Sequence, residues 1–353
     1  MRTGLLIGCL LLVVLGVAAT GTPEIAVDQP TYDFGSIGLG YMVKHTFVLQ
    51  NTGDEMLEIV YVRASCGCTT TALSKTQLAP GESVPLEVLV VADHGTTKNV
   101  SIYVHSNAPD IYGRENDDRD EYDIKLTVSG AITPKQDYEI APFELAYDLL
   151  LLVDVRDADS YAANHLMGAV SIPANELPSC VASLPNNARL IIYDLAGEAA
   201  NAAVEMLIND GQVWSYYLTG GLSHWVEVQG DLFLVNEAPL PTGDNGNEET
   251  SSGRPYSQGE LRSDFYVLID LRDANSFAAG HLAGAVNIPS GQLLQWVDRI
   301  PRTTKVVVYD NDQSLTATAY GILRNEGFTR VLMLLGGLNE WVYQYGEGYV
   351  IGF

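Results

Sequence analysis

Two aspartates stand at equivalent places in the chain, each directly after a short apolar segment. Asp194 follows residues 190–193, and Asp310 follows residues 306–309. Both segments are typical of buried β-strands, and we expect a sharp loop and then a helix after each aspartate. A strand that leads into a helix N-terminus is where α/β proteins place reactive groups and bind anions. The first question is therefore what chemistry a carboxylate could do at that place.

Two chemical roles are open to Asp310. The run Asp310-Asn311-Asp312 is similar to the Asp-x-Asp motif of haloacid-dehalogenase-type phosphatases, whose first Asp is a nucleophile and which bind magnesium. Alternatively, Asp270, Asp310 and Asp312 could converge at one edge of a sheet and bind a divalent cation. The first loop has no second aspartate, since Asp194 is followed by Leu195 and Ala196. We expect neither a metal nor a cofactor.

The cysteines offer a second kind of chemistry. Cys66 and Cys68 stand one residue apart, so they could close a small disulfide, form half of a metal site or remain structural thiols. No His or Cys pair has the spacing that would complete a metal site, whereas redox use of the two thiols stays open. Cys180 is expected in a helix before residues 190–193, away from the Asp194 loop.

These residues recur because residues 138–353 contain a duplication. Leu152-Val153-Asp154-Val155-Arg156 recurs as Leu268-Ile269-Asp270-Leu271-Arg272, and Gly220-Gly221-Leu222 with Trp225 recurs as Gly336-Gly337-Leu338 with Trp341. One offset relates every pair, as it does His165 and His281 (281 − 165 = 116). A constant offset without a gap indicates two copies of one domain. We expect the two histidines to be hydrogen-bonded scaffold residues and the two tryptophans to lie in the core.

Each copy alternates predicted strands and helices. Asp157 or Asp159 is expected to cap the helix after the first strand. The helix after the Asp194 loop should begin at Glu198 and end at Gly211. Its apolar stripe is predicted at Ala199, Ala203, Met206 and Leu207, and the matching stripe in the second copy at Leu315, Ala319, Ile322 and Leu323, ended by Gly327. The pattern predicts a small α/β domain with a parallel sheet, made twice.

Residues 24–132 have a different pattern. About seven short runs rich in β-forming residues recur at roughly 10-residue spacing and are separated by turn residues such as Asn51-Thr52-Gly53. This favours an antiparallel β-sandwich. The segment is similar to the bacterial "domain of unknown function 1573" family through Tyr32-Asp33-Phe34-Gly35, Asn51-Thr52-Gly53 and Ser65-Cys66-Gly67-Cys68-Thr69. That resemblance implies an immunoglobulin-like fold and no known activity.

Charge and the N-terminal residues limit the partners and the location. The formal net charge of −25 should repel nucleic acid phosphates and anionic membrane surfaces. Residues 1–21 combine a basic start, an apolar run and small residues, which is typical of a secretory signal peptide. We therefore expect an exported protein in the periplasm, at the cell surface or outside the cell of a bacterium, with no membrane contact beyond an uncleaved signal anchor.

The two copies resemble the rhodanese homology domain. The family pattern has strand-Asp-Val-Arg, Gly-His-Ile-x-Gly-Ala-x-Asn-Ile-Pro, Val-Val-Tyr-Cys-x-x-Gly-x-Arg and Gly-Gly-x-x-x-Trp, and both copies match it over nearly their whole length. In the family, the cysteine after Val-Tyr accepts a sulfane sulfur, and the backbone N–H groups of the following loop surround that sulfur. The resemblance places Asp194 and Asp310 at this cysteine's position. The loop arginine is missing from both copies as well.

The sequence therefore predicts a multidomain protein: an immunoglobulin-like β-sandwich (24–132) after the signal peptide (1–21), then rhodanese-like domains at 138–237 and 254–353 joined by a linker (238–253). A carboxylate cannot form a persulfide, and each Asp should cap its own loop instead of leaving the amides to an anion. We expect a non-catalytic module that binds an unknown protein partner. The alternatives are a thiol redox or sulfur-relay protein that uses Cys66 and Cys68, and a sulfurtransferase with residual activity.

Overall fold

The structure is a computed structural model that describes residues 21–109, 123–185, 188–231, 233–235, 253–300, 302–347 and 350–351. The predicted signal peptide, except residue 21, and the predicted linker, except residue 253, lie outside these residues. The chain divides into two compact units. Met1–Gly35, Val43–Val90 and Thr97–Gly130 form the first, and Ser36–Met42, Val91–Thr96 and Ala131–Phe353 form the second. No helix in the described residues is both long and apolar enough to cross a lipid bilayer.

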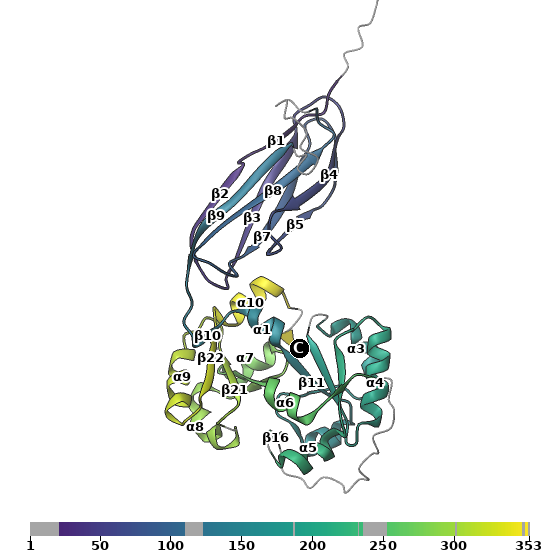
Figure 1. Cartoon of the computed structure of the whole chain (residues 1–353), viewed down its shortest axis with the longest axis vertical. Helices are drawn as coiled ribbons and strands as arrows, with labels where there is room; N and C mark the ends of the chain where they lie inside the picture. Colours follow the sequence, from purple (N-terminus) through teal and green to yellow (C-terminus); the bar gives the residue numbers. More distant parts are fainter. Residues whose placement is uncertain are drawn as a thin grey trace, which may run out of the picture. The chain divides into compact units, whose positions relative to one another are not determined.

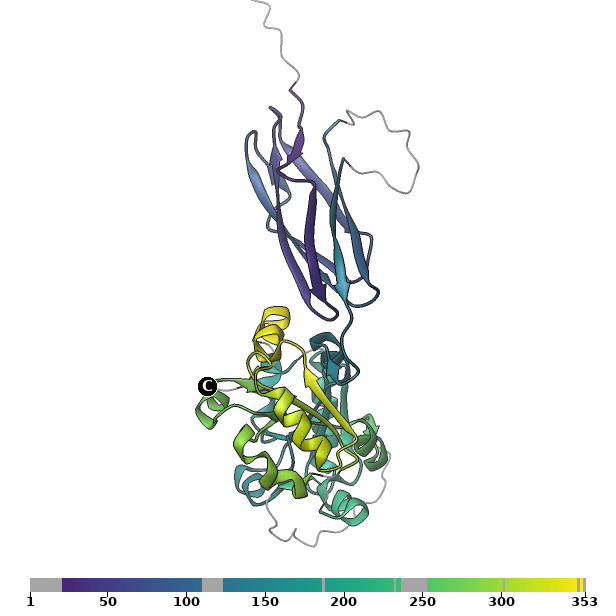
Figure 2. The ribbon, with the colours of Figure 1, turned by 90° about the vertical axis from the view of Figure 1, so that its left-hand side faces the viewer.

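The N-terminal domain is all-β, as predicted. Its strands are β1 (Ile25–Val27), β2 (Thr31–Gly38), β3 (Met42–Asn51), β4 (Leu57–Ala64), β5 (Thr69–Leu73), β6 (Gln77–Leu78), β7 (Ser83–Val91), β8 (Thr97–Ser106) and β9 (Ile124–Thr133). They form one sheet in the order β1-β3-β7-β5 and another in the order β2-β9-β8-β4-β6 (Figures 1 and 2). Buried and exposed residues alternate along β7 and β8, because successive side chains of a strand point to opposite faces.

The predicted turn at Asn51 is held by the Asn51 side chain. Its Oδ1 accepts the backbone N–H of Gly53 at 3.0 Å, and its Nδ2 donates to the carbonyl oxygens of Glu55 at 2.7 Å and Leu78 at 2.9 Å. Asn51 is fully buried, so these bonds satisfy a side chain that would otherwise be costly to enclose. The motif therefore fixes the end of β3 against the segment that leads into β4.

The two repeats follow in chain order. The first contains β10 (Glu139–Ile140), α1 (Pro142–Asp148), β11 (Leu150–Asp154), α2 (Ala158–Ala163), β12 (His165–Leu166), β13 (Val170–Ser171), α3 (Leu177–Cys180), β14 (Arg189–Tyr193), α4 (Glu198–Asn209), β15 (Ser215–Leu218), α5 (Gly221–Gln229) and β16 (Leu234–Val235). The second contains β17 (Pro255–Tyr256), α6 (Gln258–Asp264), β18 (Tyr266–Asp270), α7 (Ala274–Ala279), β19 (His281–Leu282), β20 (Ala285–Asn287), α8 (Leu293–Trp296), β21 (Lys305–Tyr309), α9 (Thr316–Asn325), β22 (Arg330–Leu334), α10 (Gly337–Tyr345) and β23 (Val350–Ile351). The predicted α/β class of both repeats is confirmed.

Helix α4 begins at Glu198 as predicted but buries a different stripe. Its buried residues are Ala200, Ala203, Val204 and Leu207. Ala199 is exposed, so its predicted place in the stripe was wrong, whereas Met206 is half-buried and packs against a core cluster. The spacing i, i+3, i+4 and i+7 from Ala200 is that of a helix lying on a sheet. The apolar residues on both sides of this stripe left its rotation undecided in the sequence, and contact with the sheet decided it.

The two repeats exchange edge strands. The parallel sheets have the orders β13-β11-β14-β15-β17 and β20-β18-β21-β22-β10, so each ends in a strand from the other repeat (Figure 1). Strand β10 pairs with β22, with the Met333 N–H donating to the Tyr138 carbonyl at 2.8 Å, and β17 pairs with β15, with the Thr219 N–H donating to the Tyr256 carbonyl at 3.1 Å. The following helices α1 and α6 contact α10 and α5, respectively.

The hydrophobic cores are shared in the same way. One core cluster joins Leu152 and Trp225 of the first repeat to Ile269 and Val308 of the second. The other cluster also draws buried residues from both repeats and contains Trp341. Neither repeat therefore encloses a complete core by itself, which explains why both belong to one compact unit.

We predict that the two repeats unfold in a single transition. Replacing Trp225 or Trp341 with Ala should lower the free energy of unfolding by about 3–5 kcal/mol in each case, since both side chains are fully buried. Either substitution should weaken both repeats equally because the cores are shared. Hydrogen exchange of strands β14 and β21, measured by mass spectrometry, would show this. Loss of protection in the substituted repeat alone would contradict the prediction.

Candidate functional site

The loop after β14 is closed around the carboxylate of Asp194. One carboxylate oxygen accepts the backbone N–H of Gly197, and the other accepts that of Ala199 at 2.7 Å. Gly197 has a φ of 101°, a left-handed conformation that glycine adopts without strain, and α4 begins at the next residue. Asp194 is largely buried. Its carboxylate therefore occupies the place at the helix N-terminus where an anion would otherwise meet these amides.

The loop after β21 is closed in the same way, with more donors. Asp310 Oδ1 accepts the N–H groups of Asp312 at 3.2 Å and Gln313 at 2.5 Å, and Oδ2 accepts the N–H of Leu315 at 2.5 Å and the Ser314 hydroxyl at 3.1 Å. Gln313 has a φ of 70°, which is uncommon for a residue other than glycine. Both oxygens of this buried carboxylate are thus engaged by the loop that follows it.

The glycine pairs hold both loops from the other side. The N–H of Leu222 donates to the Asp194 carbonyl at 2.9 Å, and the N–H of Leu338 donates to the Asp310 carbonyl at 2.8 Å. A Cβ atom on Gly221 would lie 2.7 Å from the Asp194 carbonyl oxygen, and one on Gly337 would lie 2.5 Å from that of Asp310. The recurrent Gly-Gly motif is therefore explained by the close approach of helices α5 and α10 to the two loops.

Beside each loop lies a buried group that the sequence reasoning did not assign, consisting of Asp154, Arg156 and Tyr193 in the first repeat. Arg156 donates to Asp154 Oδ1 from Nε at 3.0 Å and to Oδ2 from Nη2 at 2.6 Å. The Tyr193 hydroxyl accepts the backbone N–H of Leu166 at 3.0 Å. Burial, and then the Asp154 carboxylate, raises the pKa of Tyr193 well above its ordinary value. The recurrence of Asp-x-Arg in both repeats was the signal that could have revealed this group.

The second repeat has the same group, built around Asp270. Arg272 donates to Asp270 Oδ1 from Nε at 2.9 Å and to Oδ2 from Nη2 at 2.6 Å, and Asp270 is fully buried. Arg272 Nη1 also donates to the Asn311 side chain at 3.1 Å, which ties the pair to the loop. Asp270 and Asp310 therefore serve an arginine and loop amides instead of facing a common point. The described residues contain no group of three His, Cys, Asp or Glu side chains suited to a metal ion.

The two histidines are bound to the helix before them. His165 Nδ1 lies 2.8 Å from the Tyr161 carbonyl oxygen, and His281 Nδ1 lies 2.9 Å from that of Phe277. Because a carbonyl only accepts, Nδ1 carries the proton in both rings. Burial lowers the pKa of both imidazoles. These contacts agree with the expected scaffold role.

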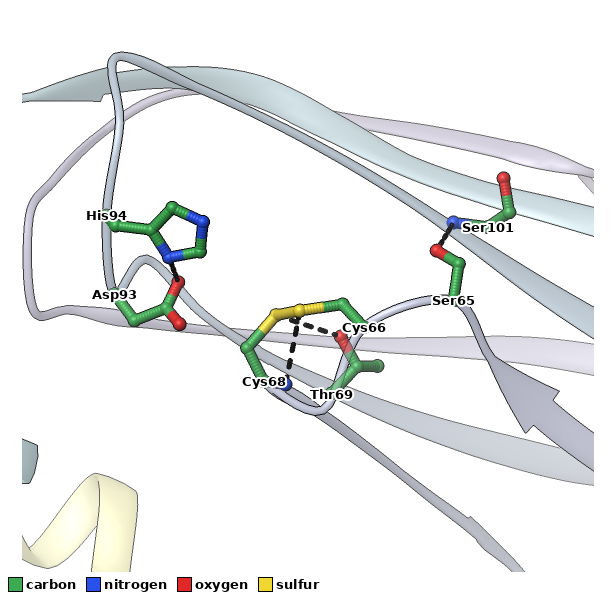
Figure 3. The surroundings of a disulfide bond; sticks show 7 residues. All are labelled: Ser65, Cys66, Cys68, Thr69, Asp93, His94 and Ser101. Carbon is green, nitrogen blue, oxygen red and sulfur yellow. Dashed lines mark hydrogen bonds and ion pairs between the residues drawn. A yellow bond between two sulfur atoms is a disulfide. The ribbon is translucent and has the colours of Figure 1, made fainter.

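Cys66 and Cys68 form a disulfide in the N-terminal domain (Figure 3). The backbone N–H of Cys68 donates to Cys66 Sγ at 3.2 Å, and Cys68 Sγ lies 3.8 Å from the Thr69 hydroxyl (Figure 3). The sequence had left open a disulfide, half of a metal site or structural thiols, and the structure shows the disulfide. Cys180 is a free, half-buried thiol at the end of α3, which agrees with its expected place in a helix before β14.

Comparison with known proteins gives two families. A model of the rhodanese-like domain matches residues 144–228 and 257–344, and a model of a protein of unknown function, DUF1573, matches residues 25–112. The thiosulfate sulfurtransferase GlpE of Ectopseudomonas mendocina (strain ymp) is 34% identical over 89 residues, which are 25% of this chain and 80% of that protein. The thiosulfate sulfurtransferase of Azotobacter vinelandii is 25% identical over 239 residues, 54% of this chain and 88% of that protein.

Among solved structures, a protein of unknown function from Porphyromonas gingivalis W83 is 18% identical, with a TM-score of 0.27, over 33% of this chain and 50% of that chain. The thiosulfate sulfurtransferase of Pseudomonas aeruginosa is 21% identical, with a TM-score of 0.24, over 60% of this chain and 42% of that one. This chain thus spans half or less of these two solved chains. The family models and the similar sequences show that the chain belongs to the rhodanese-like family. Its two rhodanese-like domains follow a domain of the DUF1573 type in the chain.

Proposed function

We propose that the two rhodanese-like domains do not transfer sulfur and that the protein is a binding or scaffold module. The observation that carries this is the position of the Asp194 and Asp310 carboxylates, which accept hydrogen bonds from their own loops. A thiosulfate sulfurtransferase, as several relatives are named, needs a thiolate that can accept a sulfur atom. A carboxylate cannot form that persulfide.

Electrostatics support the same proposal. An anionic donor that approached either loop would meet a buried carboxylate and amides that are already engaged. Residues 195–200 and 311–316 contain no arginine or lysine to offset that charge. The loops are therefore poorly suited to an anionic substrate.

The scaffold part of the proposal is supported by what the domains retain. The buried Asp154–Arg156 and Asp270–Arg272 pairs, the glycine pairs and the core tryptophans maintain the fold, although the loops lack the family's reactive group. A fold kept without its chemistry fits a role in binding a protein partner. The N-terminal pattern of residues 1–21 supports a site of action outside the cytoplasm.

Residual sulfur transfer would have to use the free thiol, Cys180. It ends helix α3, and its Sγ lies 3.9 Å from the Ser179 hydroxyl. It is not part of either loop of amides and does not follow a strand of the sheet. The structure therefore gives this alternative no anion site for its donor.

We predict that restoring a thiol at the loop makes a persulfide possible. In a Cys180→Ser background, Asp310→Cys and Asp194→Cys should each gain the mass of one sulfur atom after incubation with thiosulfate. The thiolate would attack the outer sulfur of thiosulfate, forming a new S–S bond while the old one breaks and sulfite leaves with its electron pair. Intact-protein mass spectrometry measures the adduct, and the freed amides should stabilise it.

The parent protein and the matched Asp310→Ser and Asp194→Ser variants should gain no sulfur. Thiosulfate turnover with a thiophilic acceptor should be absent from the unmodified protein. The triple replacement of Cys66, Cys68 and Cys180 removes every thiol after the predicted signal peptide. Turnover that survives it would refute the proposal, because the protein would then transfer sulfur without a thiol.

A second candidate function is thiol redox or sulfur relay by Cys66 and Cys68. It is favoured by their disulfide and by the Cys68 N–H that donates to Cys66 Sγ. In the reduced protein this donor could hydrogen-bond a Cys66 thiolate and favour it as the attacking group. The pair would then have one attacking and one resolving cysteine.

We predict that Cys66 in the reduced, folded protein is alkylated by iodoacetamide about threefold to tenfold faster than Cys68, because the thiolate is the reactive form and only Cys66 Sγ accepts a backbone N–H. Peptide mass spectrometry after short exposures measures both rates. The urea-unfolded protein is the control, in which the rates should be equal. Equal rates in the folded protein, or no thiols released by a reductant, would contradict this second candidate.

A further inference from the structure

A groove of about 380 Å³ lies where the strands of the second sheet begin, at the end opposite to the Asp310 loop. It is lined by Lys305, Arg324 and Arg330 together with Tyr138, Tyr266 and Tyr320. Lys305, Tyr266 and Arg330 are the first residues of β21, β18 and β22. Asp310 directly follows the other end of β21, so five residues, or about 16 Å of strand, separate it from Lys305. We call this hollow the basic groove.

Two cations of the basic groove, Lys305 and Arg324, have contacts that hold them in place, and no ion pair within the described residues neutralises any of the three. The Lys305 ammonium lies 4.8 Å from the centre of the Tyr266 ring. Arg324 donates to the carbonyl oxygens of Phe328 at 3.0 Å and Thr329 at 2.8 Å. Within the described part of the chain, the side chains of Lys305 and Arg330 form no ion pair or hydrogen bond. Asp137 is the one carboxylate among the residues that line the groove.

The tyrosines and the exchanged strand complete the groove. The rings of Tyr138 and Tyr320 lie 5.1 Å apart, and Tyr138 directly precedes the exchanged strand β10. The Tyr266 hydroxyl donates to Asp148 at 3.2 Å. Burial and the nearby Arg330 lower the pKa of Lys305, whereas Asp264 and Asp148 act in the opposite direction. The positive side chains thus stand beside partly enclosed aromatic faces.

Comparison of the repeats shows that the fold does not require these cations. At the positions 116 residues earlier (305 − 189 = 116), the first repeat has Arg189 for Lys305, Trp214 for Arg330 and Ile208 for Arg324. Arg189 is paired with Asp264 at 3.6 Å. The same end of the first sheet has Arg189, which has an acidic partner, and Arg254, whose Nη1 donates to the Val213 carbonyl oxygen. Within the described residues, Lys305 and Arg330 have no such partner, which makes this end of the second sheet a candidate anion site.

We propose that the basic groove binds a small aromatic oxyanion, in which a carboxylate or phosphate is attached to an aromatic ring. The volume lies near the lower end of that of small-molecule sites. The cations would hold the oxyanion, and the tyrosines would lie against its ring. A polyanion is disfavoured because the chain's net charge of −25 repels it in proportion to its charge, whereas an anion of one or two charges is repelled far less.

The test uses the full chain with phenyl phosphate and benzoate as probes. Isothermal titration calorimetry at low ionic strength measures the binding of each probe. At least one probe should bind saturably with one site per chain. The double variant Lys305→Gln/Arg330→Gln should weaken that binding at least tenfold. The matched control Lys44→Gln, which removes an exposed cation of the N-terminal domain, should leave it unchanged. Near-UV circular dichroism checks that both variants remain folded.

The two probes distinguish the sources of the oxyanion. Stronger binding of phenyl phosphate would assign a phosphate ligand, and stronger binding of benzoate a carboxylate. Absence of saturable binding by both probes would overturn the proposal, as would unchanged affinity in a folded double variant. Neither outcome depends on whether the Asp194 and Asp310 loops are inactive, since no residue of these loops lines the groove.

Discussion

The exchange of edge strands between the two repeats is the constraint on which the α/β unit depends. Strand β10 can pair with β22, and β17 with β15, only if both repeats are folded against each other. The core clusters follow from this, because each is filled from both repeats. The duplication thus produced one folding unit from two similar sequences. The exchange also brings Tyr138, a residue of the first repeat's sequence, to the basic groove of the second repeat.

Within this unit, the charged side chains at the two ends of a sheet differ in their bonding partners. At the carboxyl end, the Asp154–Arg156 and Asp270–Arg272 pairs are buried with complementary hydrogen bonds, and the loop aspartates are satisfied by backbone amides. The hydrogen bonds at this end balance these groups internally. At the opposite end of the second sheet, Lys305 and Arg330 form no ion pair within the described residues. These two cations therefore lie away from the place where the family's chemistry is expected.

The loop aspartates fit the local fold of the strand, loop and helix around them. Asp194 and Asp310 keep the strand, the loop and the helix in place, because a carboxylate caps a helix N-terminus well. The same capping bonds occupy the donors that would hold an anion. The Gly221 and Gly337 contacts remain as close as the loops require.

The sequence alone determined the all-β domain, the duplicated α/β domain and the places of the loop aspartates, because constant spacing, apolar runs and turn residues are local signals. It also predicted that Asp157 or Asp159 caps α2, and the bond from the Ser160 N–H to the Asp157 carboxylate shows that Asp157 is the cap. The rotation of α4, the Asp154–Arg156–Tyr193 group, the exchanged strands and the basic groove were decided only by tertiary structure. Each depends on which residues distant in sequence come into contact, and a pattern that records only spacing along the chain cannot determine that.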